Sequence, residues 1–143
     1  MKWRQIEQQP RSYVLVFNTG DELAKGLKDF ATEQNLADAS FKAIGALASV
    51  RLAWFNPETK RYQISVDLKE QVELLSLIGD VAQHDGKPIV HAHAVVGRPD
   101  GSTAGGHLME ASVRPTCEVF LTESPMHLSK ALDPDSGLVL IKL

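Results

Sequence analysis

The 143-residue chain has little of what marks several common protein classes. It contains one cysteine, Cys117, which excludes an internal disulfide. It has no apolar run near the roughly 18 residues of a membrane-spanning helix, and its start, MKWRQIEQQPRS, lacks the apolar core of a secretion signal. We therefore expect a cytoplasmic protein with no membrane partner.

The chain also has no concentrated run of positive charge. The net charge is −3, and lysine and arginine are scattered along the chain rather than gathered in a run. Proteins that bind nucleic-acid backbones usually carry a basic patch, so the charge gives no support to DNA binding. The chain also lacks a Gly-x-Ser-x-Gly element, a phosphate-binding loop and a dinucleotide fingerprint, which leaves the corresponding chemistries without a sequence basis.

One helix is predicted near the N-terminus. It should begin at Asp21 and Glu22, whose charges suit the positive end of a helix, and it should end near Asn35. Apolar residues recur at helical spacing on one face, which we expect to be buried. These residues are Leu23, Leu27, Phe30 and Ala31.

The rest of the chain has the pattern of β-strands. The predicted strands are 13–17, 39–46, 49–55, 62–68, 72–81, 88–97, 103–113, 116–121 and 138–141, whereas 129–135 should be short helix or irregular. Turn residues at 56–60 and 84–86 allow successive strands to pair as hairpins in a meander. One main helix packed on a mostly antiparallel sheet predicts an α+β fold, with residues 1–143 as a single domain.

Three histidines should meet where two of these strands pair. His91 and His93 alternate on one strand and therefore share a face. The loop Pro99-Asp100-Gly101 has the residue types of a three-residue hairpin connection, which makes Arg98 face Ser102 and sets His93 directly opposite His107. Directly opposed residues have Cβ atoms about 4.5–5.5 Å apart, so all three rings should crowd one patch.

Three imidazoles on one patch are a typical ligand set for a divalent metal, with Zn²⁺ the expected ion. Three protein ligands and an open fourth position mark a catalytic rather than a structural zinc site. Iron, nickel, copper or manganese would fit the same ligands. The alternatives are solvated or hydrogen-bonded rings, and a bulge at Gly105-Gly106 that would turn His107 to the other face. His84 and His127 lie outside the pattern, and we expect them on the surface.

A metal enzyme would also need a carboxylate to act as general acid or base. Glu73 and Glu118, both flanked by apolar residues, are the candidates for this catalytic role, and Glu110 is a weaker one because it is out of phase with His107. Each of them can equally be a solvated strand residue. Cys117 could be a fourth ligand, but a lone cysteine in an apolar strand favours a core position. Met109, opposite His91 in this register, should pack.

Taken together, several short segments resemble the PPC domain, the plant and prokaryote conserved family. These segments are ELLSLIG (73–79), HAHAVVG (91–97), Asp100-Gly101, GGHL (105–108) and TCEV (116–119). The resemblance covers nearly the whole chain. It implies a homotrimer of α+β subunits, a family name of DNA-binding protein, and a metal site of many bacterial members at the positions of His91, His93 and His107.

Two features qualify what the resemblance implies. The DNA-binding label comes from plant members in which a separate AT-hook precedes the domain, whereas this chain offers only Val96-Gly97-Arg98-Pro99 inside the predicted turn. The family also often carries an arginine shortly before its glutamate run, where this chain has Glu70-Gln71-Val72. The fold and histidine arrangement are also similar to acetolactate decarboxylase, in which three histidines hold zinc.

The sequence thus supports three hypotheses of different classes. The first is a trimeric PPC-domain protein with a three-histidine metal site and the family's regulatory or DNA-associated role. The second is a metal-dependent lyase or hydrolase that acts on a small oxo-acid or ester, with Glu73 or Glu118 as the acid–base partner. The third is a trimeric assembly module whose histidines are only structural.

Overall fold

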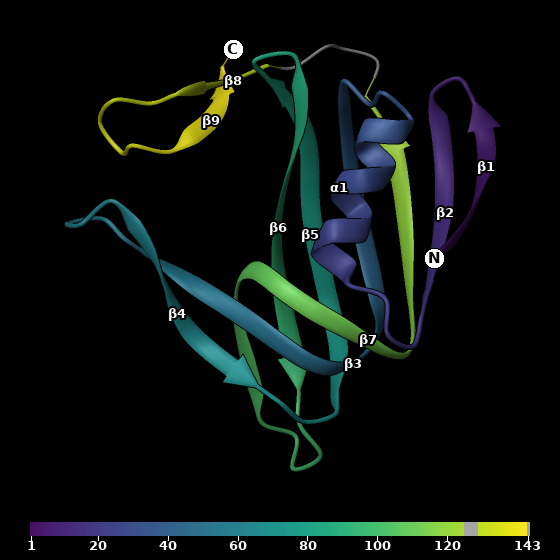
Figure 1. The fold of residues 1–143 in the computed structure, drawn as a ribbon, viewed down its shortest axis with the longest axis vertical. Helices are drawn as coiled ribbons and strands as arrows, with labels where there is room; N and C mark the ends of the chain where they lie inside the picture. Colours follow the sequence, from purple (N-terminus) through teal and green to yellow (C-terminus); the bar gives the residue numbers. More distant parts are fainter. Residues whose placement is uncertain (125–128, 143) are drawn as a thin grey trace.

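The computed structural model describes residues 1–124 and 129–142. This part of the chain folds as one helix and a large β-sheet (Figure 1). The elements are β1 (Lys2–Gln8), β2 (Arg11–Asn18), α1 (Leu23–Glu33), β3 (Asp38–Asn56), β4 (Arg61–Leu68), β5 (Val72–His84), β6 (Lys87–Gly97), β7 (Thr103–Glu123), β8 (Ser129–Leu132) and β9 (Val139–Lys142). Across the described ranges, none of the chain forms a helix that is long and apolar enough to cross a membrane.

Helix α1 forms where the sequence predicts it. The Glu22 side chain caps the helix by accepting hydrogen bonds from the amides of Ala24 and Lys25, which would otherwise lack partners. Beyond the C-terminus of the helix, Asn35 takes a left-handed conformation with φ of 49°. The predicted apolar face is buried, and it consists of Leu23, Leu27, Phe30 and Ala31.

The sheet is mostly antiparallel and bends back on itself. Its main path runs β1-β2-β7-β3-β5-β8-β9, β4 pairs with β3, and β6 bridges β5 and β7. Strands β3, β5, β6 and β7 therefore form a closed cycle of pairings. A parallel bridge between Gln83 of β5 and Ser129 of β8 makes the sheet mixed rather than purely antiparallel.

Five sequence predictions need correction. The predicted strands 39–46 and 49–55 are one strand, β3, and 103–113 and 116–121 are one strand, β7. Register shifts within the β3–β7 pairing let both strands bend without leaving the sheet, which is the effect of β-bulges. Part of the segment predicted as helical or irregular is β8, and β1 is an additional, largely exposed edge strand without apolar alternation. The meander is incomplete because β5 pairs with β3 instead of β4.

The two faces of the central sheet differ in character. One face packs against α1 and forms the core, to which β6 contributes Ala92, Ala94 and Val96. The other face carries the alternate residues, among them His91 and His93. Large apolar side chains are exposed on or beside this second face, namely Ile44, Leu75, Ile78, Val95 and Phe120. The histidines therefore lie on the face that α1 leaves uncovered.

Candidate metal centre

The β6–β7 hairpin sets the positions of the three histidines, and its register confirms the prediction. His93 pairs directly with His107, and the pairing continues to Gly97 and Thr103. The loop closes through hydrogen bonds from the Arg98 amide to the Ser102 carbonyl (2.8 Å) and from the Gly101 amide to the Arg98 carbonyl (2.9 Å). Gly101 has a φ of 81°, the left-handed conformation that this loop requires.

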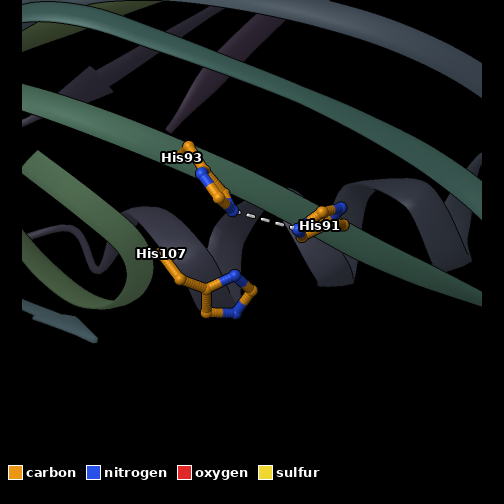
Figure 2. Close-up of side chains that lie close together, drawn as sticks. All are labelled: His91, His93 and His107. Atoms are coloured by element: carbon orange, nitrogen blue, oxygen red, sulfur yellow. Dashed lines mark hydrogen bonds between the residues drawn. The ribbon is translucent and has the colours of Figure 1, made fainter. Parts of the chain in front are cut away.

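The pairing ends at the histidines because β7 leaves β6 there. His107 also pairs with Ala53 of β3, and Leu108 pairs with Leu52. Met109 consequently does not pair with His91, contrary to the sequence prediction. The departure of β7 leaves His107 facing His91 and His93 from the side (Figure 2).

The three rings converge closely enough to hold one ion. One nitrogen from each imidazole lies within 4.8 Å of the other two. The Nε2 atoms of His91 and His93 are 3.3 Å apart. Two nitrogens that bind zinc tetrahedrally at about 2.0–2.1 Å would be about 3.3–3.4 Å apart. The spacing of this pair therefore fits a shared tetrahedral ion, and His107 would need to approach it further.

The cluster favours neutral imidazoles, the form that binds metals. Burial, followed by the influence of His91 and His93, lowers the pKa of His107 from its usual 6.5 to about 4. Burial and the neighbouring His91 also lower the pKa of His93. Within the described residues, the buried Nδ1 of His107 has no hydrogen-bond partner, a condition that a metal ligand bond would relieve.

A carboxylate and an aromatic ring support the cluster from outside. Asp80 of β5 pairs with His91 across the strands, and its Oδ2 lies 3.3 Å from His91 Nδ1. Its other oxygen contacts Nζ of Lys130, whose side chain is only 3% exposed. Burial alone would raise the pKa of Asp80, but the contacts with His91 and Lys130 outweigh burial and lower it. The Tyr62 ring stacks on His107 with a centroid separation of 4.2 Å.

A cavity of about 590 Å³ adjoins His107. Pro88 and Val90 of β6, Met109 of β7 and Lys28 of α1 contribute to its lining. Ala24, Lys25 and Lys28 of α1, together with Ala92 of the core face of β6, place this cavity between the helix and the sheet. Of the three histidines, His107 alone lines it.

The two candidate catalytic glutamates lie together, but at a distance from the histidines. Glu73 and Glu118 both line a second cavity, of about 530 Å³, with apolar neighbours. Glu73 pairs with Gly97, whereas His93 pairs with Ile78, five positions further along β5. At about 3.3 Å per residue this places Glu73 about 16 Å from the cluster along the strand. Within one chain, neither carboxylate therefore lies beside the histidines.

The remaining candidates have ordinary structural roles. Cys117 is fully buried in the core, which raises the pKa of its thiol to about 12. Glu110 lies on the surface beside Arg51, at 3.2 Å. The ring of His84 contacts the Lys130 carbonyl at 3.0 Å, and His127 falls outside the described residues.

Sequence reasoning missed Asp80, Tyr62 and Lys130. Asp80 could have been found, because the turn at Asp85-Gly86 fixes the β5–β6 register just as the next loop fixes that of β6–β7. Counting back from that turn places Asp80 opposite His91. No comparable signal exists for Tyr62 or Lys130, which reach the site through the pairing of distant strands.

Comparison with known proteins places the chain in a family. Residues 4–125 match the model of the Plants and Prokaryotes Conserved (PCC) domain, and the chain belongs to this family. The resemblance predicted from the sequence segments is therefore confirmed.

Solved structures of relatives have the same fold. A plant- and prokaryote-conserved (PPC) protein of Pyrococcus horikoshii is 34% identical, with a TM-score of 0.85 over 93% of this chain and 92% of that one. The metal-containing protein of Archaeoglobus fulgidus is 32% identical, with a TM-score of 0.84 over 99% and 97%. A protein of Bacteroides thetaiotaomicron, named "putative DNA binding protein", is 29% identical, with a TM-score of 0.91 over 99% and 96%.

Two further similarities cover a smaller part of the other protein. The α-acetolactate decarboxylase of Bacillus subtilis shares the fold at 14% identity, with a TM-score of 0.53 over 78% of this chain and 51% of that one. The bifunctional protein GlmU of Synechococcus sp. (strain JA-3-3Ab) is 35% identical over 132 residues. These residues are 89% of this chain but 20% of GlmU, so the chain spans about a fifth of that curated relative.

Proposed function

We propose that this PPC-domain protein binds a divalent metal ion, Zn²⁺ in the first instance, through His91, His93 and His107. The convergence of three imidazoles, two of them spaced as a tetrahedral ion requires, carries the proposal. The carboxylate that contacts the outer nitrogen of His91 is a second feature of histidine metal sites. The name of the Archaeoglobus fulgidus relative adds support, since it describes a metal-containing protein.

Metal analysis tests this proposal directly. Protein purified without chelator and reconstituted in zinc should hold one ion per chain by elemental analysis, and His93→Ala should hold none. His84→Gln is the matched control, because it removes an imidazole outside the cluster and should leave the stoichiometry unchanged. Wild-type protein without metal after reconstitution would refute the proposal.

We also propose that the uncovered sheet face assembles a homotrimer. His93, Ile78, Lys42 and Phe120 form one row of directly paired residues across four strands. Ile78 is 66% exposed and Phe120 45% exposed, and clusters of this kind mark interaction sites on soluble proteins. Light scattering should give three times the chain mass for the wild type. Ile78→Glu should shift the protein towards the monomer, while a wild-type monomer would contradict the trimer.

The biological role that we assign to this assembly is regulatory and DNA-associated, in line with the name of the Bacteroides thetaiotaomicron relative. The net charge of −3 gives this role no electrostatic help. A mobility-shift assay at low and rising salt decides the matter. Binding that weakens as salt rises would support DNA contact, and no shift at low salt would remove DNA from the list of partners.

A metal-dependent lyase or hydrolase acting on a small oxo-acid or ester is the second candidate. The three-histidine set favours it, because three protein ligands leave a coordination position open to such a substrate. Glu73 or Glu118 could then act as general acid or base only if another chain brought it to the metal. Turnover of a small oxo-acid or ester by the zinc-loaded protein, lost in Glu73→Gln or Glu118→Gln, would establish this activity.

A further inference from the structure

Lys130 is buried in an unusual place. It lies on β8, its side chain is 3% exposed, and it is the one buried lysine among residues 1–124 and 129–142. A buried ammonium group is costly unless it is paired. Here the pairing is with Asp80, which also contacts the candidate ligand His91.

These contacts form a chain from the C-terminal hairpin to the metal centre. Nζ of Lys130 contacts Oδ1 of Asp80, and Oδ2 of the same carboxylate lies 3.3 Å from Nδ1 of His91. A carboxylate beside Nδ1 favours the proton on that nitrogen and leaves Nε2 free to bind a metal. Nε2 of His91 is the atom that faces His93 at 3.3 Å.

The β8–β9 hairpin has few other attachments to the sheet. One bridge pairs Ser129 with Gln83, the ring of His84 contacts the Lys130 carbonyl, and Lys60 Nζ donates to the Pro134 carbonyl at 3.1 Å. Figure 1 shows the hairpin projecting beyond β5 and β6, at the end of the molecule opposite β1. The buried pair of Lys130 and Asp80 is therefore a main anchor of this hairpin.

We propose that Lys130 is a positioning residue that acts through Asp80 on His91, so that docking of the β8–β9 hairpin and metal binding stabilise each other. The inference rests on the proposed metal-binding function and adds regulation to that site. Coupling of this kind is reciprocal: metal binding holds the hairpin in place, and displacement of the hairpin lowers the affinity of the site for the metal.

Zinc titration of metal-free protein by calorimetry tests the coupling. Partners that orient metal-binding histidines typically contribute about 10–100-fold in affinity. We expect Asp80→Asn and Lys130→Met each to weaken zinc binding by about tenfold or more. The double variant should weaken binding little beyond either single variant, because both substitutions break one chain of contacts.

Lys60→Met is the matched control. Lys60 holds the same hairpin through Pro134 but does not contact Asp80. Because the Lys130–Asp80 pair remains to keep the hairpin docked, this variant should bind zinc within about threefold of the wild type. Two results would overturn the inference alone: wild-type affinity in Lys130→Met, or equal losses in Lys60→Met and Lys130→Met. Wild-type protein that takes up no zinc would refute the proposed function itself.

A second measurement does not depend on the folding of any variant. Nitrogen-detected NMR of the metal-free wild type distinguishes the two neutral tautomers of each histidine. His91 should carry its proton on Nδ1, beside Asp80. A proton on Nε2 would contradict the positioning role even if zinc binds.

Discussion

Gly79 is the position where one added methyl group should disturb both the core and the metal centre. A Cβ atom built there would lie 2.4 Å from the carbonyl oxygen of His91 and 2.3 Å from Cζ of Phe41. Ordinary van der Waals contact begins near 3.4 Å, so each of these two neighbours would have to move away by about 1 Å. Phe41 is 4% exposed in the packed core, and the other obstacle is backbone of β6. Neither can move freely.

We therefore expect Gly79→Ala to lower the free energy of unfolding by about 2–3 kcal/mol, within the range for overpacked cores. The loss exceeds the roughly 0.4–1 kcal/mol that glycine-to-alanine replacement can gain by restricting the unfolded chain. Urea unfolding followed by circular dichroism, at one fixed protein concentration, measures it. Zinc affinity should fall as well, because the displaced oxygen belongs to His91.

Gly105→Ala is the matched control in the neighbouring hairpin. The atom nearest to its added Cβ is the Ala94 carbonyl oxygen at 3.2 Å, which needs only a small adjustment. This variant should stay within about 1 kcal/mol of the wild type. Equal stability of the two variants, or a Gly79→Ala protein as stable as the wild type, would refute the argument from close approach.

Three further predictions concern other parts of the molecule. Cys117 is fully buried and its thiol has a pKa of about 12, so it should resist Ellman's reagent at pH 8 in the folded protein and react after urea unfolds the chain. Rapid reaction of the folded protein would contradict its core position. Phe30→Ala, which removes a fully buried ring that packs edge-on against Tyr13, should cost about 3–5 kcal/mol in urea unfolding, and a loss below 1 kcal/mol would be inconsistent with that packing. In the metal-free folded protein, burial lowers the pKa of His107 to about 4, whereas the same imidazole in the unfolded chain takes up its proton near pH 6.5. The free energy of unfolding should therefore be at its full value above pH 6.5 and should decline as the pH falls towards 4. His107→Gln should reduce this decline, and an unchanged pH profile in that variant would count against the burial of the ring.

Local chemistry explains why the histidine cluster could be predicted. The Pro-Asp-Gly loop fixes the β6–β7 register within a few residues, and that register alone places His93 opposite His107. The same reasoning applied to Asp85-Gly86 would have added Asp80. The capped helix was equally predictable because Glu22 and the apolar spacing are local signals.

The remaining structure depends on contacts between distant segments. A bulge and a turn have similar residue signals, so the bends of β3 and β7 looked like strand ends. Lys130 reaches Asp80 from a segment whose short run SKAL carries no strand pattern. Glu73 and Glu118 looked like partners of the metal because both are acidic residues in apolar strands, but strand register places them at a separate cavity.

The proposed metal site and the proposed assembly surface lie on the same face of the sheet. His93 lies in one row with Ile78 and Phe120, so a subunit that covers those apolar side chains would also cover the approach to the histidines. Covering a metal centre excludes water and strengthens its electrostatic interactions. A neighbouring chain is also the available route for a carboxylate like Glu73 to reach the ion. Under these two proposals, the choice between a regulatory metal protein and an enzyme depends on which side chain a second subunit places at the fourth coordination position.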